Sequence, residues 1–312
     1  MMELPPDHRR VATMNIAQKI RRRLVEQRDR IVSKMSRCRS RWHEWRVRNA
    51  PRYINPTPEE LELIERDLRA LGVEVADYSP SADAFRAFQG GNYFPDDYIG
   101  GRQSAVWDEK LLEHWIASER LGLLDYGPGE VYVDVAAASS PWAHAVRTRK
   151  GIEAHAIDLE TVAAAYSGLS YYRIENATAT SFPDASVKGA SLHCAFEMFV
   201  GDDDVRFIGE VARILAPGGK VVILPLYMHT HYCAYSTPEY FGKGYSDAGA
   251  REYVRLDCLG VPSSRKYDAA MLKSRVLDAV VSQGMRYTLL ALRNKDELGN
   301  GIYCHFVLEI SR

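Results

Sequence analysis

The spacing of apolar residues changes near residue 130, and the part before that point reads as helical. Thr57-Pro58 begins a helix with acids in its first turn, and Gly72 ends it. A second helix is predicted over 107–121, after an aromatic, glycine-containing loop at 90–106. We therefore interpret 56–120 as a helical cap that forms part of a substrate site. The apolar face of the first helix consists of Leu61, Ile64, Leu68 and Leu71.

From residue 130 onward, short β-rich runs alternate with helical segments, which predicts a parallel sheet covered on both faces. The chain ends in two β-rich runs, Arg286 to Leu292 and Ile302 to Ile310, joined by a polar turn at 294–301. Two such runs predict an antiparallel hairpin. The fold class is thus α/β: a doubly wound, seven-stranded, mostly parallel sheet with a terminal hairpin. Its earlier strands are predicted at 131–135, 153–157, 170–174, 187–193 and 220–226, with helices at 142–149 and 203–215.

The first 55 residues carry most of the positive charge of the chain. They contain 15 Lys or Arg against five acids, about +10, whereas the whole chain has a net charge of -1. Leu24, Ile31, Cys38 and Trp45 recur every seven residues, with Trp42 on the neighbouring line, which indicates a helix with one packed stripe. We predict a basic helical extension over 1–55. A dimer helix that makes a homo-oligomer and a surface for anionic lipid at a membrane are the functional alternatives.

The composition is typical of a soluble globular protein with reduced cysteines. Apolar residues make up 46% and charged residues 26%, as in soluble globular proteins. The five cysteines are spread out without a CxxC pair, so we expect reduced thiols rather than a disulfide framework or a zinc site. No apolar run approaches the roughly 20 residues of a membrane span. A cytoplasmic location is expected, and no nucleic-acid partner is predicted.

Several motifs of the second part occur in an order seen in one family. The strand 131–135 is followed by a tight turn, and Asp158 closes the next strand. Phe182-Pro183-Asp184-Ala185-Ser186-Val187 follows Asn176-Ala177, and Arg213 to Lys220 reads RILAPGGK before an apolar strand. From about Leu111 to the end, the chain resembles the class I S-adenosylmethionine (SAM)-dependent methyltransferases. The resemblance implies a SAM-binding methyltransferase domain over 121–312.

The resemblance also implies which residues bind SAM as cofactor. Asp158 would accept both ribose hydroxyls, and Asn176 stands where the family usually has an Asp that binds the adenine amino group. An Asn oxygen can still accept that bond. The full expected set is Asp134, Ala136, Ala138, Ser139, Asp158, Leu159, Asn176, Ala177 and His193.

The glycine-rich loop of the family is absent. Where DxGxGxG is usual, the chain reads Asp134-Val135-Ala136-Ala137-Ala138-Ser139-Ser140. If a position needs a positive φ, Ala costs roughly 1 kcal/mol or more. A catalytically inactive SAM-fold binding or scaffolding protein is therefore an alternative to an enzyme.

The base that serves the acceptor is predicted near the end of the fourth strand. Methyl transfer to an alcohol needs a base or a metal, because a protonated hydroxyl is a poor nucleophile. His193 is the first candidate, with packing against adenine as the competing role, and Glu197 is the second. His229 and His231 follow the next strand and could share one side of an extended segment. No acid ligand lies close to them in sequence, so no metal site is assigned.

The acceptor is predicted from an aromatic insert and from a similarity to one group of methyltransferases. An aromatic insert from Met228 to about Ala270 suggests a sizeable pocket. The chain is similar to bacterial methyltransferases of sugars and surface polysaccharides, which implies carbohydrate modification, namely O-methylation of a sugar or glycan precursor. Methylation of another small metabolite, at nitrogen or oxygen, is the alternative activity. A nucleotide-binding dehydrogenase is disfavoured by the PGG turn and the terminal hairpin.

Overall fold

The computed structural model describes residues 42–159, 166 and 168–312, in two compact units, Met1–Ala50 and Pro51–Arg312. Of the first unit only 42–50 are described, and Trp42 and Trp45 there are 56% and 61% exposed. These two tryptophans therefore do not form the packed stripe that the heptad spacing predicted. The rest of the predicted basic helix lies outside the described residues.

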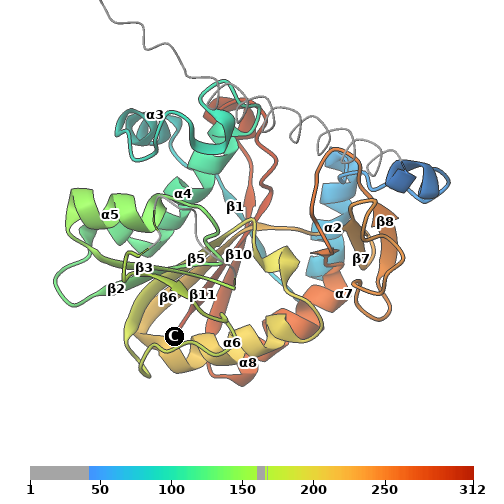
Figure 1. Ribbon diagram of the computed structural model, residues 1–312. Helices are drawn as coiled ribbons and strands as arrows, with labels where there is room; N and C mark the ends of the chain where they lie inside the picture. The colour runs from blue at the N-terminus through green and yellow to red at the C-terminus, as the bar shows by residue number, and fades with distance from the viewer. Residues whose placement is uncertain (1–41, 160–165, 167) are drawn as a thin grey trace, which may run out of the picture. The chain divides into compact units, whose positions relative to one another are not determined.

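The second unit is built on an eight-stranded sheet with the order β1-β10-β11-β6-β5-β2-β3-β4 (Figure 1). β11 is antiparallel to both of its neighbours, and the other pairs are parallel. This is the predicted doubly wound fold with its terminal hairpin. The strands are β1 (Val75–Tyr78), β2 (Val131–Val135), β3 (Glu153–Asp158), β4 (Tyr172–Ile174), β5 (Val187–His193), β6 (Leu215–Leu226), β10 (Arg286–Leu292) and β11 (Phe306–Ser311).

One strand more than the predicted seven is present. β1 comes from the segment expected to be purely helical and pairs in parallel with β10. Its four residues read Val-Ala-Asp-Tyr, which is too short a run to show alternation. The segment 56–120 therefore contributes an edge strand to the sheet as well as helices.

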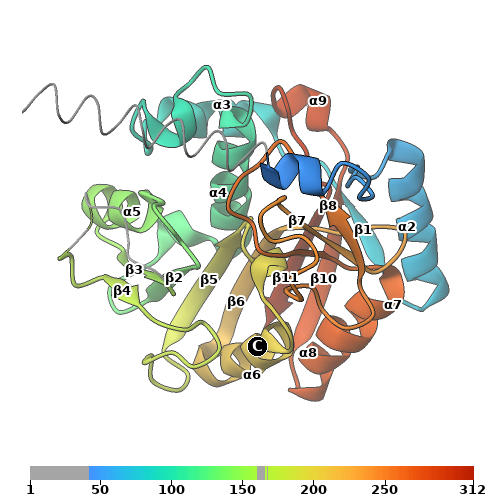
Figure 2. The same cartoon turned by 45° about the vertical axis from the view of Figure 1, so that its right-hand side comes forward.

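Helices cover the two faces of the sheet in two groups (Figures 1 and 2). One face packs against apolar residues of α2 (Pro58–Ala70), α6 (Asp203–Ile214), α7 (Ala269–Leu272) and α8 (Asp278–Ser282). The other packs against α3 (Ala82–Gly90), α4 (Trp107–Leu121) and α5 (Trp142–Lys150). The predicted start of α2 is confirmed, because Thr57 and Glu60 form a reciprocal capping box.

Two connections carry structure that the sequence did not predict. The hairpin connection contains α9 (Lys295–Leu298), not only a turn. The insert after β6 forms its own three-stranded sheet in the order β8-β7-β9. Its strands are β7 (Cys233–Ser236), β8 (Arg251–Val254) and β9 (Ser264–Lys266).

A network of charges around the buried Asp204 attaches both the insert and the segment after α7 to the start of α6. Arg265 and Arg275 both pair with Asp204, which is fully buried, and both donate to the Gly201 carbonyl, at 2.7 and 2.6 Å. Removing one partner of such a buried network leaves an uncompensated charge. The network thus fixes the loop that leads into α6.

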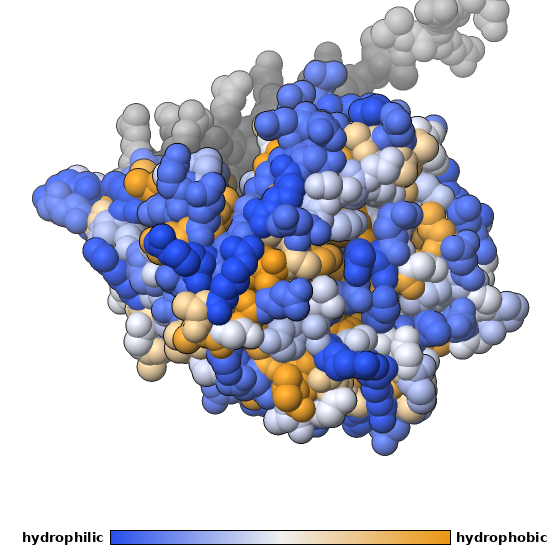
Figure 3. Space-filling model, turned by 180° about the vertical axis from the view of Figure 1, so that it is seen from behind, coloured by the Kyte–Doolittle hydropathy of each residue, from blue (hydrophilic) through white to orange (hydrophobic). Residues whose placement is uncertain are grey.

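Among the described residues, no helix has both the length and the apolar character that crossing a membrane requires. Figure 3 shows one face of the molecule, where hydrophobic residues lie in separate groups between hydrophilic ones.

Candidate functional site

Two adjoining cavities lie where the parallel strands β2, β3 and β5 end. The carboxyl edge of such a sheet is the usual ligand site in this class of fold. The larger cavity has a volume of about 320 Å³ and the smaller about 190 Å³. Ala136, Ala138 and Cys194 line both. All nine residues expected to bind the cofactor line one or both cavities.

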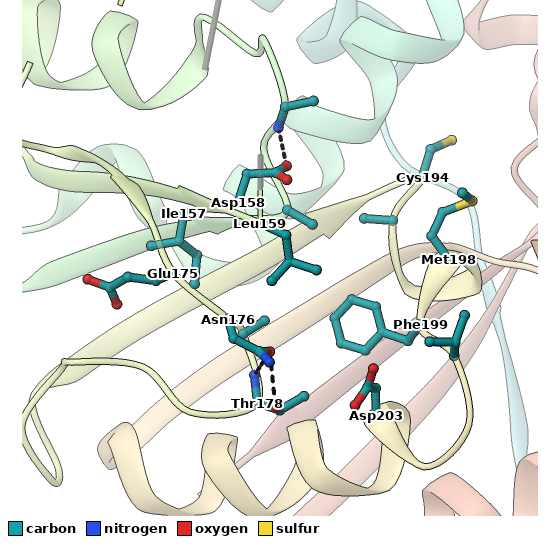
Figure 4. Close-up of a pocket in the computed structure, with 15 residues that line it drawn as sticks. Ile157, Asp158, Leu159, Glu175, Asn176, Thr178, Cys194, Met198, Phe199 and Asp203 are labelled. Carbon is teal, nitrogen blue, oxygen red and sulfur yellow. Dashed lines mark hydrogen bonds between the residues drawn. The ribbon is translucent and has the colours of Figure 1, made fainter. Parts of the chain in front are cut away.

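Asp158 stands at the end of β3 and faces the loop that follows β2 (Figure 4). Its Oδ2 accepts a hydrogen bond of 2.7 Å from the Ala138 amide. The carboxylate therefore holds the loop and still lines the larger cavity. This position suits the predicted contact with a ribose.

Asn176 lies across from the Phe199 ring in the same cavity (Figure 4). Its Oδ1 accepts from both the amide and the hydroxyl of Thr178, each at 2.9 Å. The oxygen that we expected to accept from adenine is thus already used in a local turn. Its NH₂ group is the part of the side chain that remains to donate to a ring nitrogen.

The loop without glycines adopts the conformation that glycines normally provide. Ala136 and Ala138 have φ values of 53° and 46°. A left-handed backbone places Cβ against the following carbonyl, at a cost of roughly 1–2 kcal/mol per residue. The loop is therefore folded as a binding turn in spite of its composition.

This strain predicts the effect of restoring a glycine. Ala138→Gly should raise the free energy of unfolding by about 1 kcal/mol, because glycine adopts positive φ without the Cβ penalty. Its amide can still donate to Asp158. Ala137→Gly is the matched control: Ala137 is buried and is not among the positive-φ residues, so this change should destabilise by roughly 0.5–1 kcal/mol. Urea unfolding of both variants checks the pair, and a similar loss in both would contradict the strain argument.

The smaller cavity contains buried polar atoms that lack partners. Both carboxylate oxygens of Asp134, and Nδ1 of His114 and of His193, make no hydrogen bond to any described residue. Burial raises the pKa of Asp134 to about 8. His193 Nε2 lies 3.8 Å from Asp134 Oδ1, too far for a hydrogen bond. A buried carboxyl without a hydrogen bond is costly, so a ligand that brings an ammonium group here would be well bound. The methionine end of SAM carries such a group, and the residues present fit it.

His193 is held inside this cavity as a neutral imidazole. Its Nε2 lies 2.7 Å from the Ser191 hydroxyl, and its ring centroid is 3.9 Å from that of His114. Burial, with a contribution from the Lys110 charge, lowers the pKa of His193 to about 3. A group with so low a pKa is a weak base. We therefore expect no rise in rate near pH 6–7 from His193, which remains a candidate to contact the cofactor.

Cys194, which lines both cavities, is surrounded by polar groups from three other parts of the chain. Its Sγ lies 3.2 Å from Glu113 Oε1, 3.2 Å from the Tyr227 hydroxyl and 3.4 Å from the Tyr303 hydroxyl. Lys110 Nζ donates to both oxygens of Glu113, at 2.9 and 3.1 Å. The sequence did not predict a role for Lys110, Glu113 or Tyr303. A signal was present for the first two, because Lys110, Glu113 and His114 occupy one face of a predicted helix.

The other three predicted bases line neither cavity in the described part of the chain. Glu197 comes three residues after Cys194 in the sequence and is buried. Its burial raises its pKa. His229 and His231 lie beside Cys233 in the insert. Of the four catalytic candidates, only His193 thus lies in the site.

Comparisons with known proteins give one family match and several similar solved structures. Residues 124–223 match a family model described as a methyltransferase domain. Similar solved structures include a Burkholderia thailandensis 1,6-didemethyltoxoflavin-N1-methyltransferase, with 14% identity over 84% of this chain and 93% of that one and a TM-score of 0.42. A Streptomyces coelicolor geranyl diphosphate C-methyltransferase has 14% identity, 82% and 98% coverage, and a TM-score of 0.36. A methyltransferase from Haloferax volcanii, solved with the activator Trm112, has 18% identity, 66% and 92% coverage, and a TM-score of 0.38. No curated protein sequence matches the chain.

The matched residues run from just before β2 into β6 and so include most of the cofactor-site positions described above. They hold Asp134, the loop after β2, Asp158, Asn176 and Cys194. The chain accordingly contains a methyltransferase domain over residues 124–223 and is an enzyme that uses SAM as its cofactor.

Proposed function

We propose that the protein transfers a methyl group to a hydroxyl of a small polar acceptor, a sugar or a glycan precursor. The observation that carries the proposal is the group of polar side chains around Cys194. An amine or thiol acceptor needs little beyond placement, whereas an alcohol needs a base beside it. Glu113 is a buried carboxylate at that place, with two tyrosine hydroxyls next to it.

The binding roles follow from the two cavities. The larger, mostly apolar cavity suits the adenosine part of SAM, with Asp158 at the ribose. The smaller cavity suits the methionine part, with Asp134 at the ammonium group. Bound SAM supplies an electrophilic methyl group. Cys194, which both cavities share, marks the region where that methyl group would lie.

The chain's own groups then act on the acceptor. Glu113 accepts the hydroxyl proton, and Lys110 stabilises its charge through two hydrogen bonds. The hydroxyls of Tyr227 and Tyr303 orient the acceptor oxygen. Tyr98 and residues of α4 line the smaller cavity, where they would exclude water from the bound methionine part of SAM.

An acceptor screen tests this proposal. The full-length protein and SAM with an isotopically labelled methyl group are incubated with a panel of sugars, nucleotide sugars, amines and thiols. We expect label in the hydroxyl acceptors only, with the ¹³C chemical shift of the product showing an O-methyl group. Transfer only to amines or thiols would refute the choice of acceptor. Absence of SAM binding at millimolar concentration by calorimetry would instead refute the binding roles proposed for the two cavities.

A further inference from the structure

Three metal-ligating side chains converge outside both cavities, in the segment that joins β6 to β7. His229 and His231 lie in this connection, which bends at residues 230 and 231, and Cys233 is the first residue of β7. One ligand atom from each lies within 4.8 Å of the other two. The two imidazole centroids are 4.3 Å apart.

Surrounding contacts hold these side chains in place. The Tyr253 hydroxyl lies 2.8 Å from Nε2 of His231, and the His229 amide donates to the Tyr267 carbonyl at 2.8 Å. Cys233 is fully buried and pairs in register with Lys266 of β9. Hydrogen bonds from outside a ligand set are what orient histidines in metal sites. The cluster is thus supported by β8, by β9 and by the residue after β9.

An acid lies next to the cluster. Asp268 Oδ2 accepts a hydrogen bond of 3.0 Å from the amide of Tyr232, the residue between two of the three side chains. Asp268 is more than 30 positions away from His229 and His231 along the chain, so the sequence did not predict an acid beside them. Its carboxylate offsets part of the charge that a bound cation would add.

We propose that His229, His231 and Cys233 bind one zinc ion. Two imidazoles and a thiolate are the donors that zinc prefers, and they disfavour magnesium and calcium, which take oxygen ligands. Three protein ligands leave one tetrahedral position for water. Binding releases the thiol proton of Cys233 to solvent, because the thiolate is the ligand.

The zinc would join the end of β6 to the insert sheet and would not take part in methyl transfer. None of the three ligands lines a cavity of the cofactor site. Lys266, which pairs in register with Cys233, has its Nζ 3.7 Å from the centroid of the Tyr227 ring. The proposed zinc ligands are thus separate from the side chains that line the cofactor cavities.

Metal analysis of the full-length protein tests the site. After treatment with a chelator and dialysis against zinc, we expect about one zinc per chain and a higher thermal midpoint. Cobalt in place of zinc should give a thiolate-to-cobalt charge-transfer band. Cys233→Ser should abolish the band and the zinc-dependent shift, whereas Cys258→Ser, which changes a cysteine of the insert outside the cluster, should retain both.

Two further variants keep the test decisive if Cys233→Ser fails to fold. His231→Gln changes a partly exposed ligand and should weaken zinc binding at least tenfold. Tyr253→Phe removes only the outer hydrogen bond and should weaken it by about 10- to 100-fold. The proposal would be overturned if the parent protein bound no zinc above background. It would also be overturned if His231→Gln bound zinc with the affinity of the parent. SAM affinity, measured with and without zinc, should be unchanged.

Discussion

Glu113→Gln should lower turnover by about 10²- to 10⁴-fold, the usual contribution of a positioned general base. Glutamine keeps the shape of the side chain and can still accept from Lys110, but it cannot take a proton from the acceptor. SAM affinity should change little, because Glu113 acts on the acceptor. The measurement is kcat together with the SAM dissociation constant, on an acceptor found in the screen.

Glu109→Gln is the matched control for this variant. Glu109 lies one turn earlier on α4, is equally buried, and accepts from the amides of Tyr303 and Cys304. Glutamine can accept the same bonds, so turnover should stay near that of the parent. A loss below tenfold in Glu113→Gln, or an equal loss in both variants, would remove Glu113 from the role of base.

The pH profile gives a second test of Glu113. Burial raises its pKa, and the hydrogen bonds from Lys110 oppose that rise only in part. A base works in its deprotonated form, so kcat should rise with pH through this raised pKa and level off above it. In Glu113→Gln this rise of kcat with pH should be absent. If the rise persists in the variant, another group is responsible for it.

Asp158→Ala should weaken SAM binding by several-fold to a hundredfold. A hydrogen bond to a charged group contributes about 1.5–3 kcal/mol, and each 1.4 kcal/mol is a factor of ten. The change removes both the expected ribose contact and the bond that holds the Ala138 amide. Calorimetric titration with SAM measures the effect.

Asp158→Asn separates these two contributions. The Asn oxygen can still accept from Ala138, so the loop keeps its anchor, while the charge that binds two hydroxyls is lost. We expect an affinity between those of the parent and Asp158→Ala. Parent-like affinity in both variants would exclude the ribose role.

The framework of the cofactor site was predictable because its signals are local. β2 and β5 have the predicted bounds, and β3 ends one residue later than predicted. Apolar runs and the turns between them set where each strand ends, and the parallel topology then places all carboxyl ends at one edge. This topology explains why the cavities are lined by Asp134, Asp158 and Asn176. Even the strain in the alanine loop was foreseeable, since its position in the motif called for positive φ.

The groups around Cys194 could not be predicted in the same way, because they come together only in three dimensions. Glu113 lies on α4, Tyr227 follows β6, and Tyr303 lies in the hairpin connection. No periodicity links such distant positions. Burial also decided their chemistry: it lowers the pKa of His193, the first candidate base, to about 3, which makes this histidine a weak base. The sequence by itself determined the parallel core of the sheet, its terminal hairpin and the cofactor edge, through local patterns. Only the tertiary structure decided which side chains face the acceptor, and which are charged, because contacts between distant segments and desolvation arise only on folding.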